Sequence, residues 1–269
     1  MAKRIYAVAN QKGGVGKTTT AVNLATAMAI GGYRVLLVDL DPQANATSHI
    51  GLDKQQSANI YRVLVDEIPA EAACLPTDID GVWIVPSHPD LYGAYLELPQ
   101  LEDWQYRLKA VLSPLTLRFD YIWIDTPPSL GILTINALVA AEALIVPVQS
   151  EYFALEGLTT LLQAMERVRA NYNPDLHLHA VILTMYDERT NLSRQVRDEI
   201  TQFFDQSVLK SVIPRNVRLA EAPSFGQPIF LYDIRSRGAE AYLELARELL
   251  KYGTPSVGSR SERSYAGGQ

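Results

Sequence analysis

The residues with the clearest chemical signature run from Asn10 to Thr20 and read Asn-Gln-Lys-Gly-Gly-Val-Gly-Lys-Thr-Thr-Thr. Glycines let a backbone approach an anion closely and point several N–H groups at it. An apolar run, residues 5–9, precedes this stretch, and a helical pattern, residues 19–30, follows it. A helix that starts after a glycine-rich turn adds free N–H groups and the positive end of its dipole. This context predicts a site for nucleotide phosphates.

Individual roles follow from the positions in this loop. Lys17 is expected to reach the β- and γ-phosphates, and Thr18 to place its hydroxyl on Mg²⁺. Gln11 stands where the general pattern G-x-x-x-x-G-K-[ST] has its first glycine. Lys12 adds a second cation, which could stabilise the negative charge of a triphosphate. The alternative is that Lys12 is a solvated loop residue without a role at the site. The other residues of the predicted ATP-binding loop are Gly13, Gly14, Val15, Gly16 and Thr19.

Two carboxylates, Asp39 and Asp41, follow the apolar run 35–38. Residues two apart in an extended segment point to the same side, so both are expected to face the phosphates. A carboxylate near the γ-phosphate orients the attacking water and accepts its proton, so Asp41 is predicted to be catalytic together with Lys12 and Lys17. The alternative is that Asp41 caps a turn before Pro42.

A third carboxylate, Asp125, follows the apolar run 121–124 and precedes Pro127 and Pro128. It is predicted to hold Mg²⁺, directly or through water, because a buried carboxylate without a cation is costly. The two prolines stiffen the loop that follows, which suits a sensor of the γ-phosphate. A turn or helix cap at Asp125 is the alternative.

These residues need a scaffold of alternating strands and helices. Short apolar runs without alternation are typical of parallel strands that are buried on both faces. Strands are predicted over residues 5–9, 35–38, 82–85, 121–124, 143–148, 179–184 and 208–213, and helices over 19–30, 155–170, 192–204 and 238–252. Repeated units of this kind predict an α/β fold with a doubly wound, mostly parallel sheet flanked by helices. Ligands bind at the carboxyl ends of such strands, where all the special residues fall.

Composition narrows the possible classes. The 269 residues carry a net charge of −6, so any nucleic-acid binding requires a local basic patch or an oligomer. Cys74 is the only cysteine, which excludes a disulfide framework or a cysteine-rich metal site within one chain. We expect one domain over residues 1–252 and a disordered Gly- and Ser-rich tail over 253–269. The chain has no signal peptide and no apolar stretch of ~18 residues, so a cytoplasmic protein is expected.

Five ordered blocks resemble the ParA/MinD ATPases over about residues 4–250. K-G-G-V-G-K-T is similar to their deviant Walker A loop, and residues 38–45 and 124–130 match the second and third boxes. The blocks at 183–187 and 213–224 are typical of the chromosomal ParA branch, also called Soj. The resemblance implies a P-loop NTPase fold that uses ATP and Mg²⁺, with Asp41 at the position linked to hydrolysis.

The resemblance also implies a cycle. Two ATP-bound subunits close into a homodimer, and Lys12 reaches the partner's phosphates as an arginine finger does in trans. The dimer binds DNA without sequence preference and is nucleoid-associated, until a ParB-type protein stimulates hydrolysis. Arg218 matches a family position tied to DNA contact, and Arg215, Arg235 and Arg237 are nearby candidates; the alternative is that these arginines pair with neighbouring acids. An adenine pocket is expected at Met185, Pro214 and Asn216, where a core or capping role is the alternative.

Other classes remain open at this point. One is a positioning ATPase of the MinD type on a membrane, against which the absence of a basic amphipathic terminal helix argues. Another is a related ATPase that positions a different cargo. The third is a metabolic P-loop enzyme such as an ATP-dependent amide-forming synthase, which would not need Lys12.

Overall fold

The computed structural model describes residues 4–65, 68–151 and 154–251. Its centre is a seven-stranded sheet in the order β3-β4-β2-β5-β1-β6-β7 within this described part. All neighbouring strands run parallel except the short β3, which pairs antiparallel with β4. The strands are β1 (Arg4–Val8), β2 (Val35–Asp39), β3 (Leu75–Pro76), β4 (Val82–Val85), β5 (Tyr121–Asp125), β6 (Ala143–Gln149) and β7 (His177–Thr184).

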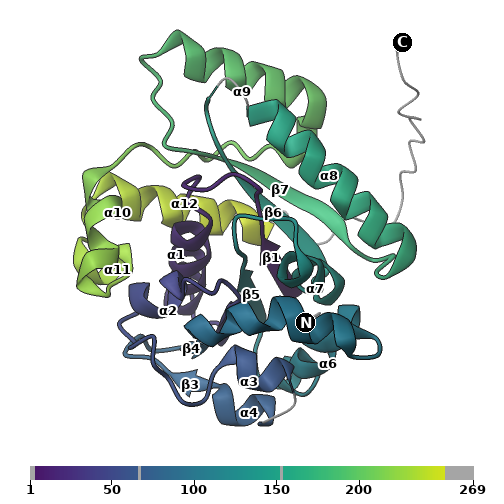
Figure 1. The fold of residues 1–269 in the computed structure, drawn as a ribbon. Coiled ribbons are helices and arrows are strands. Elements are labelled where there is room, and N and C mark those ends of the chain that lie inside the picture. Colours follow the sequence, from purple (N-terminus) through teal and green to yellow (C-terminus); the bar gives the residue numbers. More distant parts are fainter. Residues whose placement is uncertain (1–3, 66–67, 152–153, 252–269) are drawn as a thin grey trace, which may run out of the picture.

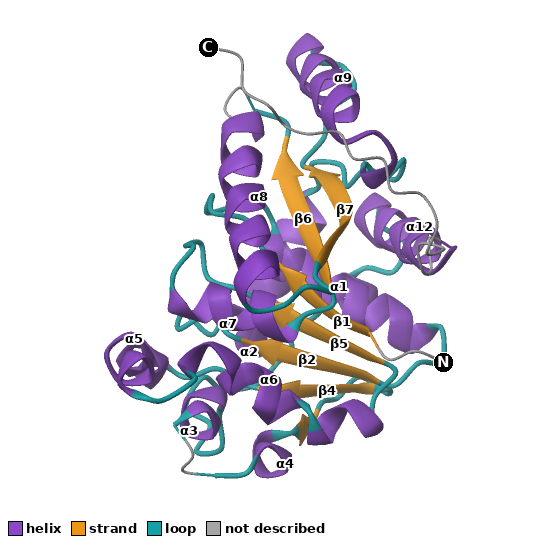
Figure 2. Ribbon diagram, turned by 90° about the vertical axis from the view of Figure 1, so that its right-hand side faces the viewer, coloured by secondary structure: helices purple, strands orange, loops and turns teal. Residues whose placement is uncertain are grey.

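Helices cover both faces of the sheet, as Figures 1 and 2 show. In Figure 2, α1 and α12 lie on one side of the strands and α6, α7 and α8 on the other. The helices are α1 (Lys17–Ile30), α2 (Asn45–His49), α3 (Ile60–Leu64), α4 (Ala70–Ala73), α5 (Ala94–Glu97), α6 (Arg107–Leu112), α7 (Ile132–Ala140), α8 (Ala154–Asn171), α9 (Asn191–Phe204), α10 (Val217–Glu221), α11 (Ile229–Tyr232) and α12 (Arg237–Lys251).

Each face of the sheet has its own hydrophobic core, because successive strand residues point to opposite sides. In β2, Leu36 and Val38 join the core under α7 and α8, whereas Val35 and Leu37 join the core under α1 and α12. All four side chains are fully buried. Burial on both faces explains the unbroken apolar runs, and the doubly wound α/β prediction is confirmed.

One predicted strand is absent. Residues 208–213 run beside β7 without forming a regular strand: Val208 makes an isolated bridge with Val181, and the N–H groups of Leu209 and Ile213 donate to the carbonyls of Val181 and Leu183 at 3.1 and 2.8 Å. Between these points the N–H groups of Lys210 and Ser211 turn away from the sheet and donate to the Glu248 carboxylate of α12, both at 2.8 Å. This diversion of two donors prevents a regular ladder.

The predicted tail over residues 253–269 lies outside the described residues, as does Tyr252. Within the part that the structure describes, no helix is long and apolar enough to cross a membrane.

Candidate nucleotide-binding site

The loop between β1 and α1 has the geometry of an anion site. Gly14 and Gly16 adopt left-handed φ angles of 74° and 85°, which favour glycine. Gly16 is the N-cap of α1, no side chain caps the helix, and its first turn holds no acidic residue. The first N–H groups of a 14-residue helix are therefore free to bind an anion.

Hydrogen bonds to the backbone of β6 and from a side chain of β7 hold this loop in place. The Asn10 amide donates to the Pro147 carbonyl at 2.7 Å, while its oxygen accepts the Lys12 N–H at 3.0 Å. The Thr184 hydroxyl donates to the Val15 carbonyl at 2.9 Å. These bonds fix the loop before any ligand arrives, so little ordering is required on binding.

Lys17 is buried, and its Nζ donates to the Lys12 carbonyl at 3.0 Å. Burial lowers the pKa of Lys17, although the nearby carboxylates of Asp125 and Asp41 act in the opposite direction. The neighbouring carboxylates therefore do not fully offset the cost of burying the charged Lys17 ammonium. A phosphate oxygen beside it would supply that compensation.

Asp125 ends β5, directly beside Asp39 in the parallel register of β2 and β5. It is fully buried, and neither carboxylate oxygen has a hydrogen bond of ordinary geometry among the described residues. Burial and the neighbouring Asp39 carboxylate raise the pKa of Asp125 well above its usual range, while Thr18 and Lys17 lower it. The orphaned oxygens, with the Thr18 hydroxyl nearby, fit a site for a divalent cation.

No group of three or more His, Cys, Asp or Glu side chains in the described ranges could hold a metal ion. A magnesium ion here would therefore take most of its ligands from phosphate oxygens and water, which is its usual mode in nucleotide sites.

The two carboxylates after β2 have different environments. Asp39 accepts the N–H and hydroxyl of Thr47 at 2.8 and 2.7 Å and the Asp41 N–H at 3.2 Å. Burial raises the pKa of Asp39 to about 6. Both carboxylate oxygens of Asp39 are thus engaged in organising the turn into α2.

Asp41 is 6% exposed, and its carboxylate accepts the Gln43 N–H at 2.9 Å, so Asp41 also takes part in the turn at Pro42. The second carboxylate oxygen of Asp41 has no hydrogen-bond partner among the described residues, and the charge of Asp41 acts on both Lys17 and Asp125. Asp41 can therefore form the turn with one carboxylate oxygen and offer the other oxygen to a ligand at the site.

Lys12 and Gly13 lie at the exposed front of the loop. The Lys12 ammonium pairs with the Glu151 carboxylate just beyond β6, and each side chain is 43% exposed. Gly13 lies opposite Pro128, whose Cβ is 3.9 Å from where a Gly13 Cβ would stand. The charge of Lys12 is thus paired within its own chain.

The structure brings the predicted adenine residues together beyond β7. Tyr186 bridges Pro214, and its N–H donates to the Ile213 carbonyl at 3.0 Å, which sets Met185 beside Pro214. Met185 has a left-handed φ of 49°, which is uncommon for a residue other than glycine. The Asn216 oxygen caps α10 by accepting the Leu219 N–H at 3.2 Å. Asn216 therefore has the capping role, which leaves its amide N–H groups for other partners.

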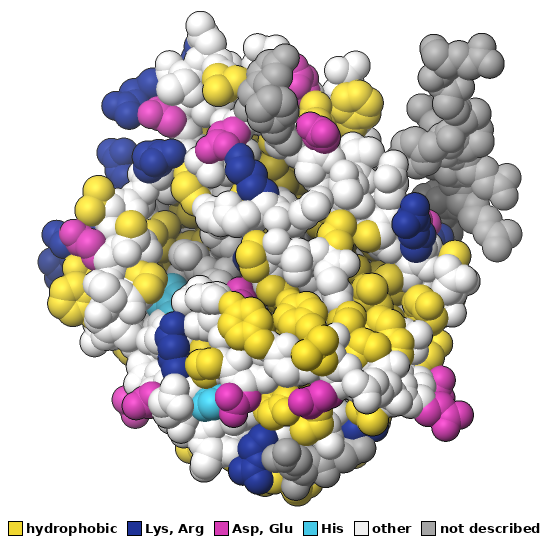
Figure 3. Space-filling view, viewed as in Figure 1, with side chains coloured by type: hydrophobic (Ala, Val, Ile, Leu, Met, Phe, Trp, Pro, Cys, Tyr) yellow, Lys and Arg dark blue, Asp and Glu magenta, His cyan; other side chains and the backbone are white. Residues whose placement is uncertain are grey.

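The four arginines differ in their pairing. Arg218 binds Glu221 at 3.0 Å and Asp233 at 3.4 Å, so the pairing alternative describes this residue. Arg215, Arg235 and Arg237 are exposed and have no side-chain ion pair among the described residues. The left side of Figure 3, which carries α10 and α11 in Figure 1, shows cationic and acidic side chains next to each other.

Several further residues support the site in roles that the sequence did not predict. They are Asn10, Thr47, Thr184, Glu151 and also Ser87, whose hydroxyl donates to the Asp41 carbonyl at 2.7 Å. Asn10 and Thr184 lie inside or beside recognised blocks, so their position was a usable signal. Ser87 and Glu151 follow strands β4 and β6, and only the common edge of the sheet points to them.

Comparison with known proteins agrees with this geometry. Residues 3–178 match the family described as AAA domain. The chain is 50% identical to the sporulation initiation inhibitor protein Soj of Bacillus subtilis, over 93% of this chain and 99% of that protein. It is 48% identical to the chromosome partitioning protein ParA of Myxococcus xanthus, over 94% of this chain and 89% of that protein.

One similar protein has been solved with ligands bound. The chain is 39% identical to cobyrinic acid a,c-diamide synthase from Mycobacterium smegmatis with bound ATP analog and magnesium, with a TM-score of 0.83 over 93% of this chain and 96% of that one. The fold and the loop site define a P-loop ATPase. With relatives at about half identity over nearly the whole length, the chain belongs to the ParA/Soj family of chromosome-partitioning ATPases.

Proposed function

We propose that this protein is an ATP-dependent dimerising ATPase that binds DNA without sequence preference and drives segregation of a chromosome or plasmid with a ParB-type partner. The observation that carries the proposal is the pair of lysines with opposite placements. Lys17 is buried between Asp125 and Asp41, whereas Lys12 stands exposed at the front of the same loop. Lys17 serves the nucleotide of its own chain, and Lys12, which is paired with the exposed Glu151, serves the nucleotide of a second subunit.

In this proposal the loop from Gly13 to Thr19 binds the phosphates of ATP, and Lys17 neutralises the β- and γ-oxygens. Thr18 and Asp125 hold Mg²⁺, which spreads the charge that develops during phosphoryl transfer. Asp41 orients the attacking water and accepts its proton. Met185, Pro214 and Asn216 form the wall against which the adenine packs.

Lys12 leaves Glu151 and contacts the phosphates of the partner subunit when two ATP-bound chains meet. Gly13 supports this step because, without a side chain beside Pro128, the backbone of a second subunit can approach the front of the loop closely. The contact exists only with ATP in place, so hydrolysis reverses dimerisation. The nucleotide thereby controls the population of the dimer.

DNA binding is assigned to Arg218, Arg215, Arg235 and Arg237 on the dimer, which would associate with the nucleoid. Arg218 is 55% exposed, and its two acidic partners lie on the same surface, so DNA phosphates would replace them. Contacts to phosphates alone carry no sequence information and weaken steeply with salt. Because the net charge is −6, DNA binding depends on such a local patch of arginines or on an assembled oligomer.

The decisive experiment measures plasmid DNA binding with ATP, ADP and no nucleotide at increasing salt. We expect binding only with ATP, and a steep loss of affinity with salt. A Lys12→Ala variant should remain monomeric with ATP in sedimentation and lose DNA binding. Equal DNA binding with ADP and ATP contradicts the proposal. A ParB-type protein together with DNA should accelerate hydrolysis more than either alone.

A second candidate is favoured by the similarity to the protein named as a cobyrinic acid a,c-diamide synthase. An amide-forming enzyme would activate a carboxylate with ATP and would not need Lys12. ATP-dependent dimerisation that survives Lys12→Ala, together with ATP consumption that depends on a carboxylic acid and ammonia, favours this candidate. A related ATPase that positions another cargo differs only in its partner.

A further inference from the structure

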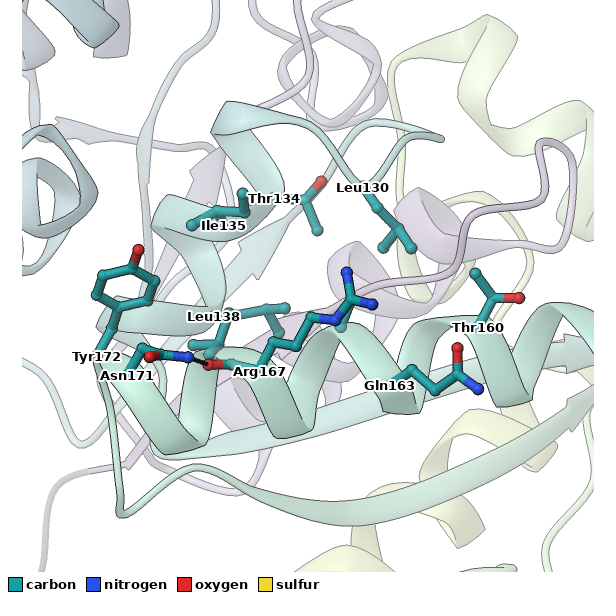
Figure 4. Close-up of a pocket in the computed structure, with 11 residues that line it drawn as sticks. Leu130, Thr134, Ile135, Leu138, Thr160, Gln163, Arg167, Asn171 and Tyr172 are labelled. Carbon is teal, nitrogen blue, oxygen red and sulfur yellow. Dashed lines mark hydrogen bonds between the residues drawn. The ribbon is translucent and has the colours of Figure 1, made fainter. Parts of the chain in front are cut away.

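A groove of about 590 Å³ lies between α7 and α8, on the face of the sheet opposite α1. Apolar side chains of α7 form one wall, and the outward side of α8 forms the other (Figure 4). It is lined by Leu130, Thr134, Ile135, Leu138, Thr160, Gln163, Ala164, Arg167, Val168, Asn171 and Tyr172. None of the residues assigned to ATP, Mg²⁺ or DNA belongs to this lining.

The walls combine an apolar floor with polar margins. Leu138 and Val168 are buried, and Leu130 and Ile135 are partly exposed to the groove. Thr160, Gln163 and Asn171 are exposed along the α8 side. A hydrophobic strip with a polar rim is the composition of a protein-binding groove.

Arg167 is the single charged residue of the lining. In Figure 4 its side chain extends from α8 into the space between the helices, toward Leu130. Its carbonyl accepts the Asn171 amide at 2.7 Å, but its guanidinium has no hydrogen bond or ion pair among the described residues. By contrast Arg169, two residues later, pairs with Glu166 at 3.1 Å. Arg167 is thus an unpaired cation over an apolar surface, which is complementary to a carboxylate with apolar neighbours.

The dimensions distinguish between kinds of ligand. The lining of α8 runs from Thr160 to Asn171, which is about 16 Å of helix at 1.5 Å per residue. Three helical turns of continuous groove match the apolar stripe of a short helix better than a compact small molecule.

We propose that the α7–α8 groove docks an amphipathic helix of a partner protein, whose apolar stripe fills the groove and whose Asp or Glu pairs with Arg167. This site goes beyond the proposed function, because it lies outside the nucleotide and DNA surfaces. Leu130, at one end of the groove, belongs to the loop that leaves Asp125, so the occupant lies next to that loop.

The test uses a display library of short amphipathic helices selected against the full-length protein. We expect enriched sequences to carry apolar residues at i, i+3 or i+4 and i+7, with one fixed acidic position. Arg167→Glu should weaken these peptides about tenfold or more, and a change of their acidic residue to Lys should restore binding to that variant. Ala164→Trp, which fills the groove, should abolish binding.

Matched controls lie on the same helix. Arg169→Glu and Ala170→Trp change exposed positions outside the lining and should leave peptide affinity within about twofold. Selected peptides without an acidic preference, or with affinities that Arg167→Glu and Ala164→Trp leave unchanged, overturn the proposal. If these two variants instead alter self-association in sedimentation, the groove is a contact between copies of this chain and the proposed partner is wrong.

Discussion

Glu151, just beyond the end of β6, binds the ammonium of Lys12 within the same chain. Because each side chain is 43% exposed, water and salt screen the pair, and it contributes at most about 1 kcal/mol. A triphosphate from a second subunit therefore competes easily for Lys12. The ion pair holds the Lys12 side chain at the front of the loop. Breaking it, so that Lys12 can contact the phosphates of a second subunit, costs only a small free energy.

We expect Glu151→Gln to favour ATP-dependent dimerisation, because the intrachain competitor for Lys12 loses its charge. The ATP concentration that gives half-maximal dimer should fall by about twofold to fivefold. Analytical ultracentrifugation across an ATP titration measures this shift. Glu156→Gln, an exposed acid on α8, is the matched control and should have no effect. Weaker dimerisation of Glu151→Gln would show that Glu151 has a positive role in the contact.

Asp39 and Asp41 should respond differently to replacement by alanine. Asp41→Ala should bind ATP and dimerise, but its hydrolysis rate should fall by about a hundredfold or more, because a base and water-positioning group is lost. Asp39→Ala should lose about 2 kcal/mol or more of stability, because three buried donors from Thr47 and Asp41 lose their acceptor. Turnover assays and urea unfolding of both variants check the pair. Normal turnover in Asp41→Ala would contradict the role proposed for this residue.

Asp125→Asn should stabilise the nucleotide-free protein and should reduce the contribution of Mg²⁺ to ATP affinity. Burial and the neighbouring Asp39 carboxylate raise the pKa of Asp125 and disfavour its ionised form, so a neutral amide at this position should raise the stability of the folded protein. ATP affinity should then be nearly the same with Mg²⁺ and with EDTA. Thermal unfolding and a nucleotide-binding titration give the two readouts. Retained magnesium dependence would place the cation elsewhere.

His49 should make stability depend on pH. Burial lowers the pKa of His49 to about 4 from 6.5, so the unfolded chain binds a proton between these values and the folded chain does not. Stability is therefore full above about pH 6.5 and falls as the pH drops toward 4, by about 2–3 kcal/mol at pH 4.5. Asp39, with its raised pKa, acts in the opposite direction over part of this range.

Comparison with His49→Phe isolates the contribution of this one residue, because Asp39 remains in both proteins. The difference in unfolding free energy between pH 7 and pH 4.5 should be smaller in the variant. Chemical unfolding at several pH values measures it. Equal pH dependence of the two proteins would mean that His49 is protonated in the folded state.

The sequence was sufficient for the features that depend on local pattern. Six strands and the glycine loop were predictable because buried parallel strands are continuously apolar and left-handed turns need glycine. The hydrogen bonds between Asp39 and Thr47 could not be predicted, because they depend on how the short helix α2 folds back over the end of β2.

Long-range contacts account for the other differences. The strand expected at residues 208–213 has suitable apolar residues, but Glu248, in a distant helix, takes two of its N–H groups. For Arg218 the sequence left DNA contact and pairing with Glu221, Asp233 or Glu240 open, and the structure pairs it with Glu221 and Asp233. No periodicity reports which acid a given arginine meets.

The interrupted pairing at residues 208–213 also affects how the protein behaves in crowded solution. Exposed edge strands recruit other chains into growing sheets. Here one edge, β7, is lined by a segment with only isolated bridges, and the other edge is the two-residue β3, which contains Pro76. Neither edge offers a regular row of backbone donors and acceptors, so polymerisation by sheet extension is suppressed.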